Sequence, residues 1–258
     1  MMMMSGMVSG VSMGPRVGES GFRRRRVVRA HGGHGKMAPA DPNSFVQTEL
    51  RAAAMKLHTR SQAPREGQAP EPRPSPVGNW APGREDYLRF LVDSRAVYSA
   101  MDAVVAGEAA LERFRGTGLE RVEALDRDIA WFESEYSIKC PPVGEAGLAY
   151  VAFLEGLCAE GNLPAFLCHY YNQYFAHTAG GRMIGAKMST DLLDGAELAF
   201  YQWPAGDVKD LLDAVRKSLD DVAAGWDREQ KDACVAETPR SFQYSGSLLV
   251  YLRGPVPV

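Results

Sequence analysis

The chain of 258 residues contains no uninterrupted run of roughly 18 apolar residues, the length that a helix needs to cross a bilayer. We therefore expect no membrane span. The N-terminus also lacks the continuous apolar segment of a secretory signal peptide, which argues against secretion by that route. Strand signals are nearly absent as well, and this favours a fold without a sheet.

Cysteine is scarce and widely spaced. The four cysteines, Cys140, Cys158, Cys168 and Cys234, form no CxxC pair or other close spacing. Zinc sites and disulfide frameworks normally show such spacing. We therefore expect these residues to be buried thiols.

Basic residues are in short supply outside the N-terminus. The chain carries 29 lysines and arginines against 32 aspartates and glutamates, a net charge of −3. Residues 1–30 hold six of the arginines and one glutamate, so the rest of the chain is more acidic than the whole. A nucleic-acid-binding protein normally has a basic surface. No nucleic-acid partner is therefore expected.

The N-terminus itself combines arginine and serine with few acidic residues, a composition typical of an organelle transit peptide. We predict that residues 1–41 are a transit peptide and lead-in, with cleavage near Val28, Arg29 and Ala30. A disordered basic arm that binds a polyanion is the alternative. Residues 42–254 then form one domain, a length sufficient for one sizeable core.

Apolar residues recur at helical spacing through most of this domain, which predicts an all-α fold. Ser44 and Gln47 form a capping box that begins a helix ending near Arg60. A Pro-rich surface connection follows at about residues 63–83, because proline cannot occupy helix interiors. Further helices are predicted over 87–105, 119–132, 148–160, 164–193 and 208–222, and from 227 onward, where Pro239 should kink or restart the last one.

Paired glycines stand out in the segment 166–185, where a long helix is otherwise predicted. Gly180 and Gly181 each cost a helix roughly 1 kcal/mol relative to alanine, and small Ala176 and Ala179 lie beside them. A large flat ligand that lies against the backbone would explain the missing Cβ atoms.

His58 is the second candidate for ligand binding. It lies on the apolar stripe of the first predicted helix, eight residues after Leu50. A single histidine in such a place is more often a core or boundary residue than a metal ligand. Arg51, however, lies seven residues earlier on the same face, roughly 10 Å away along the helix. That separation suits a guanidinium that reaches a porphyrin propionate while the imidazole reaches the iron.

Separated motifs in the chain resemble those of haem oxygenases, above all the plastid enzymes of plants and algae. They are the stretch 51–68 with its RSQAPREGQ tail, DYLRFLVDS at 86–94, GTGLER at 116–121, AHTAGGRMIG at 176–185, WDREQKDACVAET at 226–238 and SFQYSG at 241–246. They fall in the family's order, and the resemblance covers about residues 45 to 250. It implies a single-domain helical fold that holds haem between a proximal and a kinked distal helix.

The resemblance also implies roles for individual residues. His58 takes the position of the axial ligand of the haem iron. Gly180 and Gly181 take the positions of the distal glycines that lie over the haem and let that helix flex. Ala176 stands where animal relatives have a glycine, and His177 where they have an aspartate that orders water; the plastid branch also has histidine there.

The remaining residues implied by the resemblance surround the haem edge. Tyr171, Arg216 and Phe242 match positions that line the pocket or reach the propionates, and Arg51 matches a basic propionate partner. Pro239 departs from the family pattern near Phe242. His169 lies eight residues before His177, but no ExxH or HExxH motif accompanies the two, so a structural role for His169 is favoured over a metal pair.

The reaction implied by the resemblance is cleavage of haem by O2 and external electrons at a meso carbon, which gives biliverdin IXα, CO and Fe2+. Haem is then both substrate and cofactor. The donor would be reduced ferredoxin, docked on a basic patch formed by Arg182, Lys187, Arg216 and Lys217. The product would pass to a bilin reductase for chromophore synthesis in the chloroplast.

Two alternatives stay open from the sequence. One is a non-catalytic haem- or tetrapyrrole-binding protein of the same fold, against which the retention of His58 and both glycines argues. The other is a purely structural helical interaction domain.

Overall fold

The computed structural model describes residues 42, 44–57, 77 and 79–253. The predicted transit peptide, most of the Pro-rich connection and His58 lie outside these residues. Within them the chain is helical and contains no strand, which confirms the predicted all-α class. No helix in this part is long and apolar enough to span a membrane.

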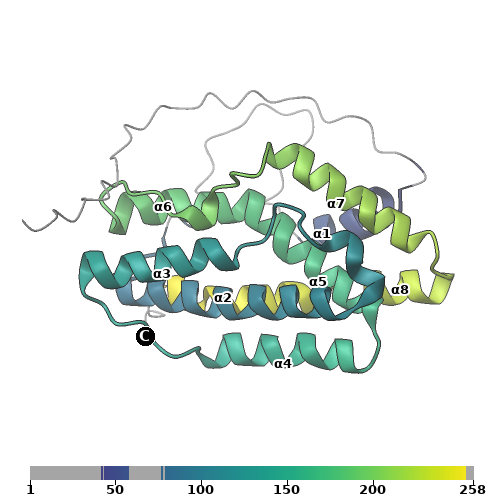
Figure 1. The fold of residues 1–258 in the computed structure, drawn as a ribbon, viewed down its shortest axis with the longest axis horizontal. Helices are drawn as coiled ribbons and strands as arrows, with labels where there is room; N and C mark the ends of the chain where they lie inside the picture. Colours follow the sequence, from purple (N-terminus) through teal and green to yellow (C-terminus); the bar gives the residue numbers. More distant parts are fainter. Residues whose placement is uncertain (1–41, 43, 58–76, 78, 254–258) are drawn as a thin grey trace, which may run out of the picture. The chain divides into compact units, whose positions relative to one another are not determined.

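The helical segments follow the predicted order closely (Figure 1). In chain order they are η1 (Val46–Leu50), α1 (Arg51–Leu57), α2 (Arg84–Gly107), η2 (Ala109–Phe114), α3 (Val122–Tyr136), α4 (Glu145–Ala159), α5 (Leu163–Ala176), η3 (His177–Gly181), α6 (Arg182–Leu192), η4 (Ala199–Tyr201), α7 (Val208–Ala223), α8 (Arg228–Ala236), α9 (Thr238–Leu248) and η5 (Leu249–Leu252).

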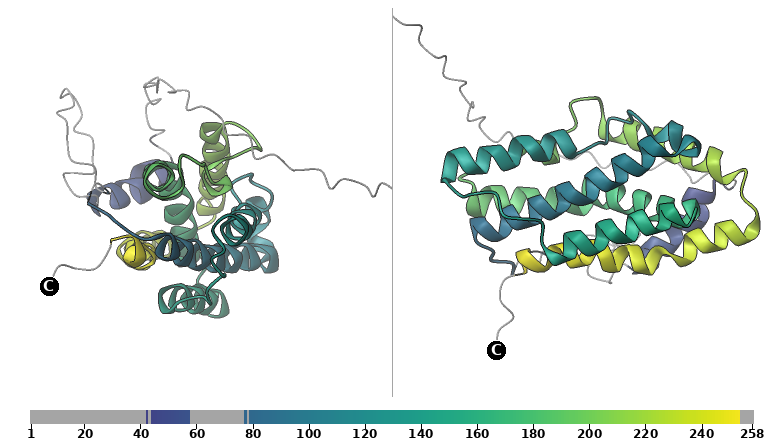
Figure 2. Two further views of the ribbon diagram at one scale, coloured as in Figure 1. Left: turned by 90° about the vertical axis from the view of Figure 1, so that its left-hand side faces the viewer. Right: turned by 60° about the horizontal axis from the view of Figure 1, so that its bottom comes forward.

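Helix α2 is the centre of the packing. It contacts α3, α4, α9 and η5, with α3 and α4 along different sides of it (Figures 1 and 2). Residues 90–94 of α2 are all buried. Five consecutive buried residues place the helix among neighbours on every side, because a helix with one face in water would expose some of them.

The second internal helix is α5, which continues through η3 into α6 without a break. It begins with Asn162, whose side-chain oxygen accepts from the Ala165 backbone N–H, and with Pro164 in its first turn. Both residues are typical of a helix start. The single helix predicted over 164–193 is therefore present, with a π-helical turn at His177–Gly181 inside it.

Buried or half-buried aspartates join helices that are distant in the sequence. Asp93, Asp128 and Asp220 each accept backbone N–H groups at the start of another helical segment, where such groups have no partner within the helix. The N···O distances are 2.7 and 3.1 Å from Asp93 to Gly144 and Gly147, 2.8 and 2.7 Å from Asp128 to Ala199 and Phe200, and 2.9 Å from Asp220 to Val46.

Two local predictions were tested near the ends of the domain. Ser44 accepts from the Gln47 N–H at 3.0 Å, as its capping role predicts, and also donates to Asp220 at 2.6 Å. The predicted restart at Pro239 is confirmed, because α8 ends at Ala236 and α9 starts at Thr238 with the proline in its first turn. A proline there sacrifices no helical hydrogen bond.

The prediction that all four cysteines are buried was wrong for two of them. Cys168 and Cys234 are buried, but Cys158 is half-buried and Cys140 is exposed. Cys140 lies in the loop between α3 and α4, directly before Pro141, where it is not part of a packed helix face. All four are free thiols.

Candidate functional site

The structure brings Arg51, Tyr171 and Arg216 together from α1, α5 and α7. Burial raises the pKa of the Tyr171 hydroxyl, and the positive charges of Arg216 and Arg51 oppose that rise. The Arg216 guanidinium also lies 4.9 Å from the ring centroid of Phe175, whose ring centroid is 4.3 Å from that of Tyr171. Arg216 therefore lies at the Phe175–Tyr171 ring pair, and the charge of Arg51 also reaches the Tyr171 hydroxyl. Two cations in this neighbourhood suit a ligand with carboxylates.

Beyond Phe175 the same helix run exposes a face of small residues. Ala176, Ala179 and Gly180 are exposed, and a Cβ atom added to Gly180 would meet nothing within 4 Å. Met183, one turn further, is 48% exposed. A helix face with little side-chain bulk leaves its backbone open to a flat ligand.

Helix α1 also exposes apolar side chains at its C-terminal end. Met55 is 39% and Leu57 41% exposed, and Arg51 of the same helix is close enough to Tyr171 for its charge to affect the pKa of the hydroxyl. Exposed apolar groups close to a cationic pair are features of a binding site for an apolar, anionic ligand. His58, the predicted iron ligand, directly follows Leu57 and lies outside the described residues.

His177 is buried in an aromatic surround. Its ring stacks on Phe200 at 4.0 Å between centroids and 22° between planes, and Tyr98, Tyr201 and Trp203 lie around it. Its Nε2 lies 2.8 Å from the Phe200 carbonyl oxygen. Burial lowers the pKa of His177 to about 3, so the imidazole is neutral near pH 7.

Gly181 makes room for this ring. A Cβ atom at Gly181 would lie 2.6 Å from His177 Nδ1, a distance that real contacts do not reach. The two predicted glycines therefore have different surroundings: the Gly180 side is open, whereas the Gly181 side faces the imidazole. The sequence could not separate them, because the position of the ring depends on Phe200, 23 residues further along.

The segment that carries Phe200 is held by two residues that the sequence analysis did not select. Asp128 accepts from the backbone N–H groups at the start of η4, as given above. Arg121 is buried and donates to the carbonyl oxygens of Gln202 at 2.5 Å and Leu119 at 2.9 Å. Arg121 is the last residue of GTGLER, so the motif was visible in the sequence but its contact with η4 was not.

Further polar groups lie along the buried side of α5. The Tyr98 hydroxyl is buried near the Gln173 side chain and has no partner with hydrogen-bond geometry among the described residues. Gln173 accepts from the Ser245 hydroxyl at 2.8 Å. Tyr174 donates to Asp102 at 3.0 Å, and burial raises the pKa of that carboxyl to about 6. An orphaned buried hydroxyl is the kind of group that an ordered water satisfies.

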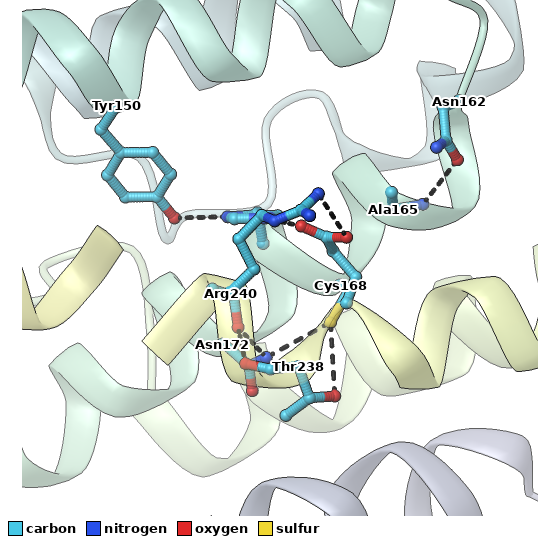
Figure 3. A network of polar contacts seen from close by, with 10 residues as sticks. Tyr150, Asn162, Ala165, Cys168, Asn172, Thr238 and Arg240 are labelled. Atoms are coloured by element: carbon cyan, nitrogen blue, oxygen red, sulfur yellow. Dashed lines mark hydrogen bonds and ion pairs between the residues drawn. The ribbon is translucent and has the colours of Figure 1, made fainter. Parts of the chain in front are cut away.

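His169 takes part in a separate network, which is drawn in Figure 3. Its Nδ1 lies 2.9 Å from the Tyr150 hydroxyl and its Nε2 lies 3.1 Å from a carboxylate oxygen of Glu237, which also pairs with Arg240. These contacts join α4, α5 and the α8–α9 junction. They favour the structural role over a metal pair, and no cluster of metal-ligating side chains occurs in the described part of the chain.

The two remaining predicted site residues lie at the surface. Ala176 belongs to the exposed small face. Phe242 is half-buried on α9 and lines a shallow groove with Ala146, Gly246 and Val250. Helix α9 contacts α1, so Phe242 is on the element next to the segment that leads to His58.

Comparison with known proteins shows one family. A family model described as "Heme oxygenase" matches residues 75–250. Heme oxygenase 1, chloroplastic, of Oryza sativa subsp. japonica is 47% identical over 223 residues, which cover 84% of this chain and 75% of the rice protein. A second rice protein, "Probable inactive heme oxygenase 2, chloroplastic", is 40% identical over 174 residues, 67% of this chain and 52% of that protein.

A solved structure supports the architecture independently. The crystal structure of heme oxygenase-1 from the cyanobacterium Synechocystis sp. PCC6803 in complex with heme matches with a TM-score of 0.64. The match covers 82% of this chain and 93% of that one at 20% identity, so it speaks for the fold alone.

Proposed function

The chain belongs to the haem oxygenase family, and from this premise we propose that it cleaves haem at a meso carbon to biliverdin IXα, CO and Fe2+ in the chloroplast. The observation that carries the proposal is the placement of two cations, Arg51 from α1 and Arg216 from α7, near Tyr171 on α5, together with the bare face around Gly180 in η3. Haem needs both, because its ring is flat and apolar while its propionates are anionic.

The residues present fit this ligand. Arg51 and Arg216 would bind the propionates, since guanidinium groups pair strongly with carboxylates. Ala176 and Gly180 would let the ring lie close to the backbone. Met55 and Leu57 supply apolar surface at the end of α1, and the next residue, His58, is proposed as the axial ligand. Bound haem supplies the iron at which O2 is activated, and its own ring is the substrate.

The polar residues of the site would order water and protons. His177 is neutral and its Nε2 contacts the Phe200 carbonyl, so the other ring nitrogen, Nδ1, is left to accept a hydrogen bond. A neutral imidazole in this state orients a water molecule as an acceptor and does not release a proton near pH 7. The Tyr98 hydroxyl offers a second partner for water.

Electrons come from a second protein, for which we propose reduced ferredoxin. An acidic donor needs a cationic surface near the haem edge. Of the predicted patch, Lys187, Arg216 and Lys217 form pairs with Asp191, Asp213 and Asp221. Arg182 is exposed at the start of α6, and Lys217 is 75% exposed despite its pair. An exposed pair such as that of Lys217 contributes little to stability, so this charge stays available to a partner. The bilin product would pass to a bilin reductase.

The test combines purified protein with hemin, reduced ferredoxin, ferredoxin reductase and NADPH. Haem oxygenase activity predicts loss of the Soret band with formation of a bilin. The second candidate is a non-catalytic haem-binding protein, which predicts a stable Soret band without product. We include it because the chain is also similar to a rice protein named as probably inactive. If the protein does not bind hemin at all, both readings fail and a structural helical module remains.

A further inference from the structure

Among the residues around His177, Phe200 both accepts a hydrogen bond from its ring and stacks on it. The carbonyl oxygen of Phe200 lies 2.8 Å from Nε2, and the Phe200 ring stacks on the imidazole. A carbonyl only accepts hydrogen bonds, so Nε2 must donate. A neutral imidazole has one N–H group, and Nδ1 therefore carries the lone pair. The space left by the missing Cβ of Gly181 lies directly beside Nδ1.

Phe200 belongs to η4 (Ala199–Tyr201), a segment too short to hold its own position. Asp128, on α3, fixes the start of this segment: one carboxylate oxygen accepts from Ala199 N–H at 2.8 Å and the other from Phe200 N–H at 2.7 Å. The Asp128 side chain is buried. Because both oxygens are used, the carboxylate defines the orientation of η4 as well as its distance from α3.

Arg121 fixes the other end of η4. Its guanidinium donates to the carbonyl oxygens of Gln202 at 2.5 Å and Phe200 at 3.4 Å, and lies 5.0 Å from the Trp203 ring centroid. The same group donates to Gly118 and Leu119 of the preceding turn. Burying a guanidinium is costly unless it is hydrogen-bonded. This one is bonded to four carbonyl groups, two at η4 and its C-cap and two in the turn before α3, so it locates η4 relative to the start of α3.

We propose that Arg121 and Asp128 are positioning residues for His177: by holding the Phe200 carbonyl from both sides, they fix the imidazole with its proton on Nε2 and its lone pair on Nδ1. The acceptor state of His177 is thus set through the Phe200 carbonyl by Asp128 on α3 and by the N-cap residue of α3, Arg121, whose positive charge also acts on the imidazole. What the acceptor does to haem-bound chemistry depends on the proposed function; the tautomer does not.

The tautomer is measurable without haem. In the full chain labelled with 15N-histidine, two-bond 1H–15N correlation spectra distinguish the two ring nitrogens, and His177→Gln identifies the signal. We expect His177 to show a protonated Nε2 and an unprotonated Nδ1. An Nδ1–H tautomer or a mixture of the two in the unsubstituted protein overturns the proposal without any variant of the positioning residues.

Two variants test the cause. Asp128→Asn and Arg121→Lys preserve size or charge but lose the paired contacts, and we expect both to convert the His177 signals to a mixture of tautomers. The matched controls are Asp126→Asn and Arg127→Lys, exposed residues on the same helix, which should leave the spectrum unchanged. An unchanged His177 spectrum in both folded test variants rules out the positioning role.

Measurements of bilin formation distinguish a failure of the positioning role from a failure of the proposed function. With hemin and the ferredoxin system, the positioning variants should lower kcat for bilin formation by about tenfold or more, as loss of an outer hydrogen-bond partner does at other sites, and should leave hemin affinity unchanged. If the unsubstituted protein makes no bilin, the proposed function fails while the tautomer result stands. If bilin forms equally fast in both variants and their spectra are unchanged, only the positioning role fails.

Discussion

Gly180 and Gly181 are neighbours in the sequence, but the surroundings of each one determine whether a side chain can be added there. A Cβ at Gly180 enters open space, whereas a Cβ at Gly181 meets the His177 ring. The pair of glycines was recognisable from the sequence, since two helix-breaking residues in a helical segment need a reason. Which of the two has open space beside it was not, because the contact between His177 and Phe200, 23 residues apart, decides it.

The first prediction concerns Gly180→Leu. The added side chain projects into the space proposed for the haem ring, so hemin affinity should fall by at least about tenfold, a loss of about 1.4 kcal/mol in binding free energy. The folded structure should persist, since nothing in the protein lies within 4 Å of the new Cβ. Hemin titration followed at the Soret band measures the effect.

Gly156→Leu is the matched control for this substitution. Gly156 is also within a helix, α4, and a Cβ there also meets nothing within 4 Å. It should gain a similar amount of helix propensity and leave hemin affinity unchanged. Full hemin affinity and full bilin formation in Gly180→Leu contradict close approach of haem to this backbone.

The second prediction concerns His177 and pH. Burial lowers its pKa from 6.5 to about 3, so between these pH values the unfolded chain binds a proton that the folded chain does not. Stability therefore falls as pH falls below 6.5, by up to about 1.4 kcal/mol per pH unit from this residue. His177→Gln keeps a donor for Phe200 but has no titrating ring, so its stability should fall less steeply.

Urea unfolding of the two proteins at several pH values between 7 and 5 measures the difference. Other titrating groups, including the buried His169, are common to both proteins and cancel. Parallel stability curves for His177→Gln and the unsubstituted protein contradict a neutral, buried imidazole at position 177.

At the scale of whole elements, periodicity and helix-capping residues carry most of the prediction. The observed bounds of α3, α4, α7 and α9 follow from apolar stripes and from proline positions that are local in the sequence. The π-helical turn η3 and the short segment η4 do not follow from such patterns. The position of η4, for example, depends on its contacts with Asp128, which no local pattern reveals.

The third prediction concerns the attachment of the first helical segment, η1 and α1. Asp220 on α7 accepts from Ser44 and from the Val46 N–H, at 2.6 and 2.9 Å. Asp220→Ala leaves these donors without their acceptor, so unfolding free energy should fall by about 1–3 kcal/mol. Because the segment carries Arg51 and leads to His58, hemin affinity should fall too.

Hydrogen exchange of residues 44–57 locates the effect, and hemin titration gives its functional consequence. The control is Asp221→Ala, the next residue, whose exposed pairs with Arg113 and Lys217 contribute little. If the backbone amides of residues 44–57 exchange equally slowly in the two variants, Asp220 does not anchor this segment.

For the molecule as a whole, haem would join parts that are far apart in the sequence: Arg51 on α1, the face of α5 and η3, and Arg216 on α7. A ligand that binds the folded state alone stabilises it, by about 2.7 kcal/mol at a concentration one hundred times Kd. The fourth prediction is therefore that hemin raises the melting temperature of the full chain, by roughly 5–10 °C for a domain of this size. Differential scanning calorimetry measures the shift.

Two comparisons separate the contribution of the iron to this stabilisation from that of the porphyrin ring and its propionates. Protoporphyrin IX has the ring and propionates but no iron, so it should give a smaller shift than hemin if His58 binds the metal. His58→Ala should reduce the hemin shift to that of protoporphyrin and abolish bilin formation, while His34→Ala, in the predicted transit peptide, should change neither. An equal hemin shift in His58→Ala and the unsubstituted protein assigns the binding energy to the cations and the bare helix face, and removes His58 from the ligand role.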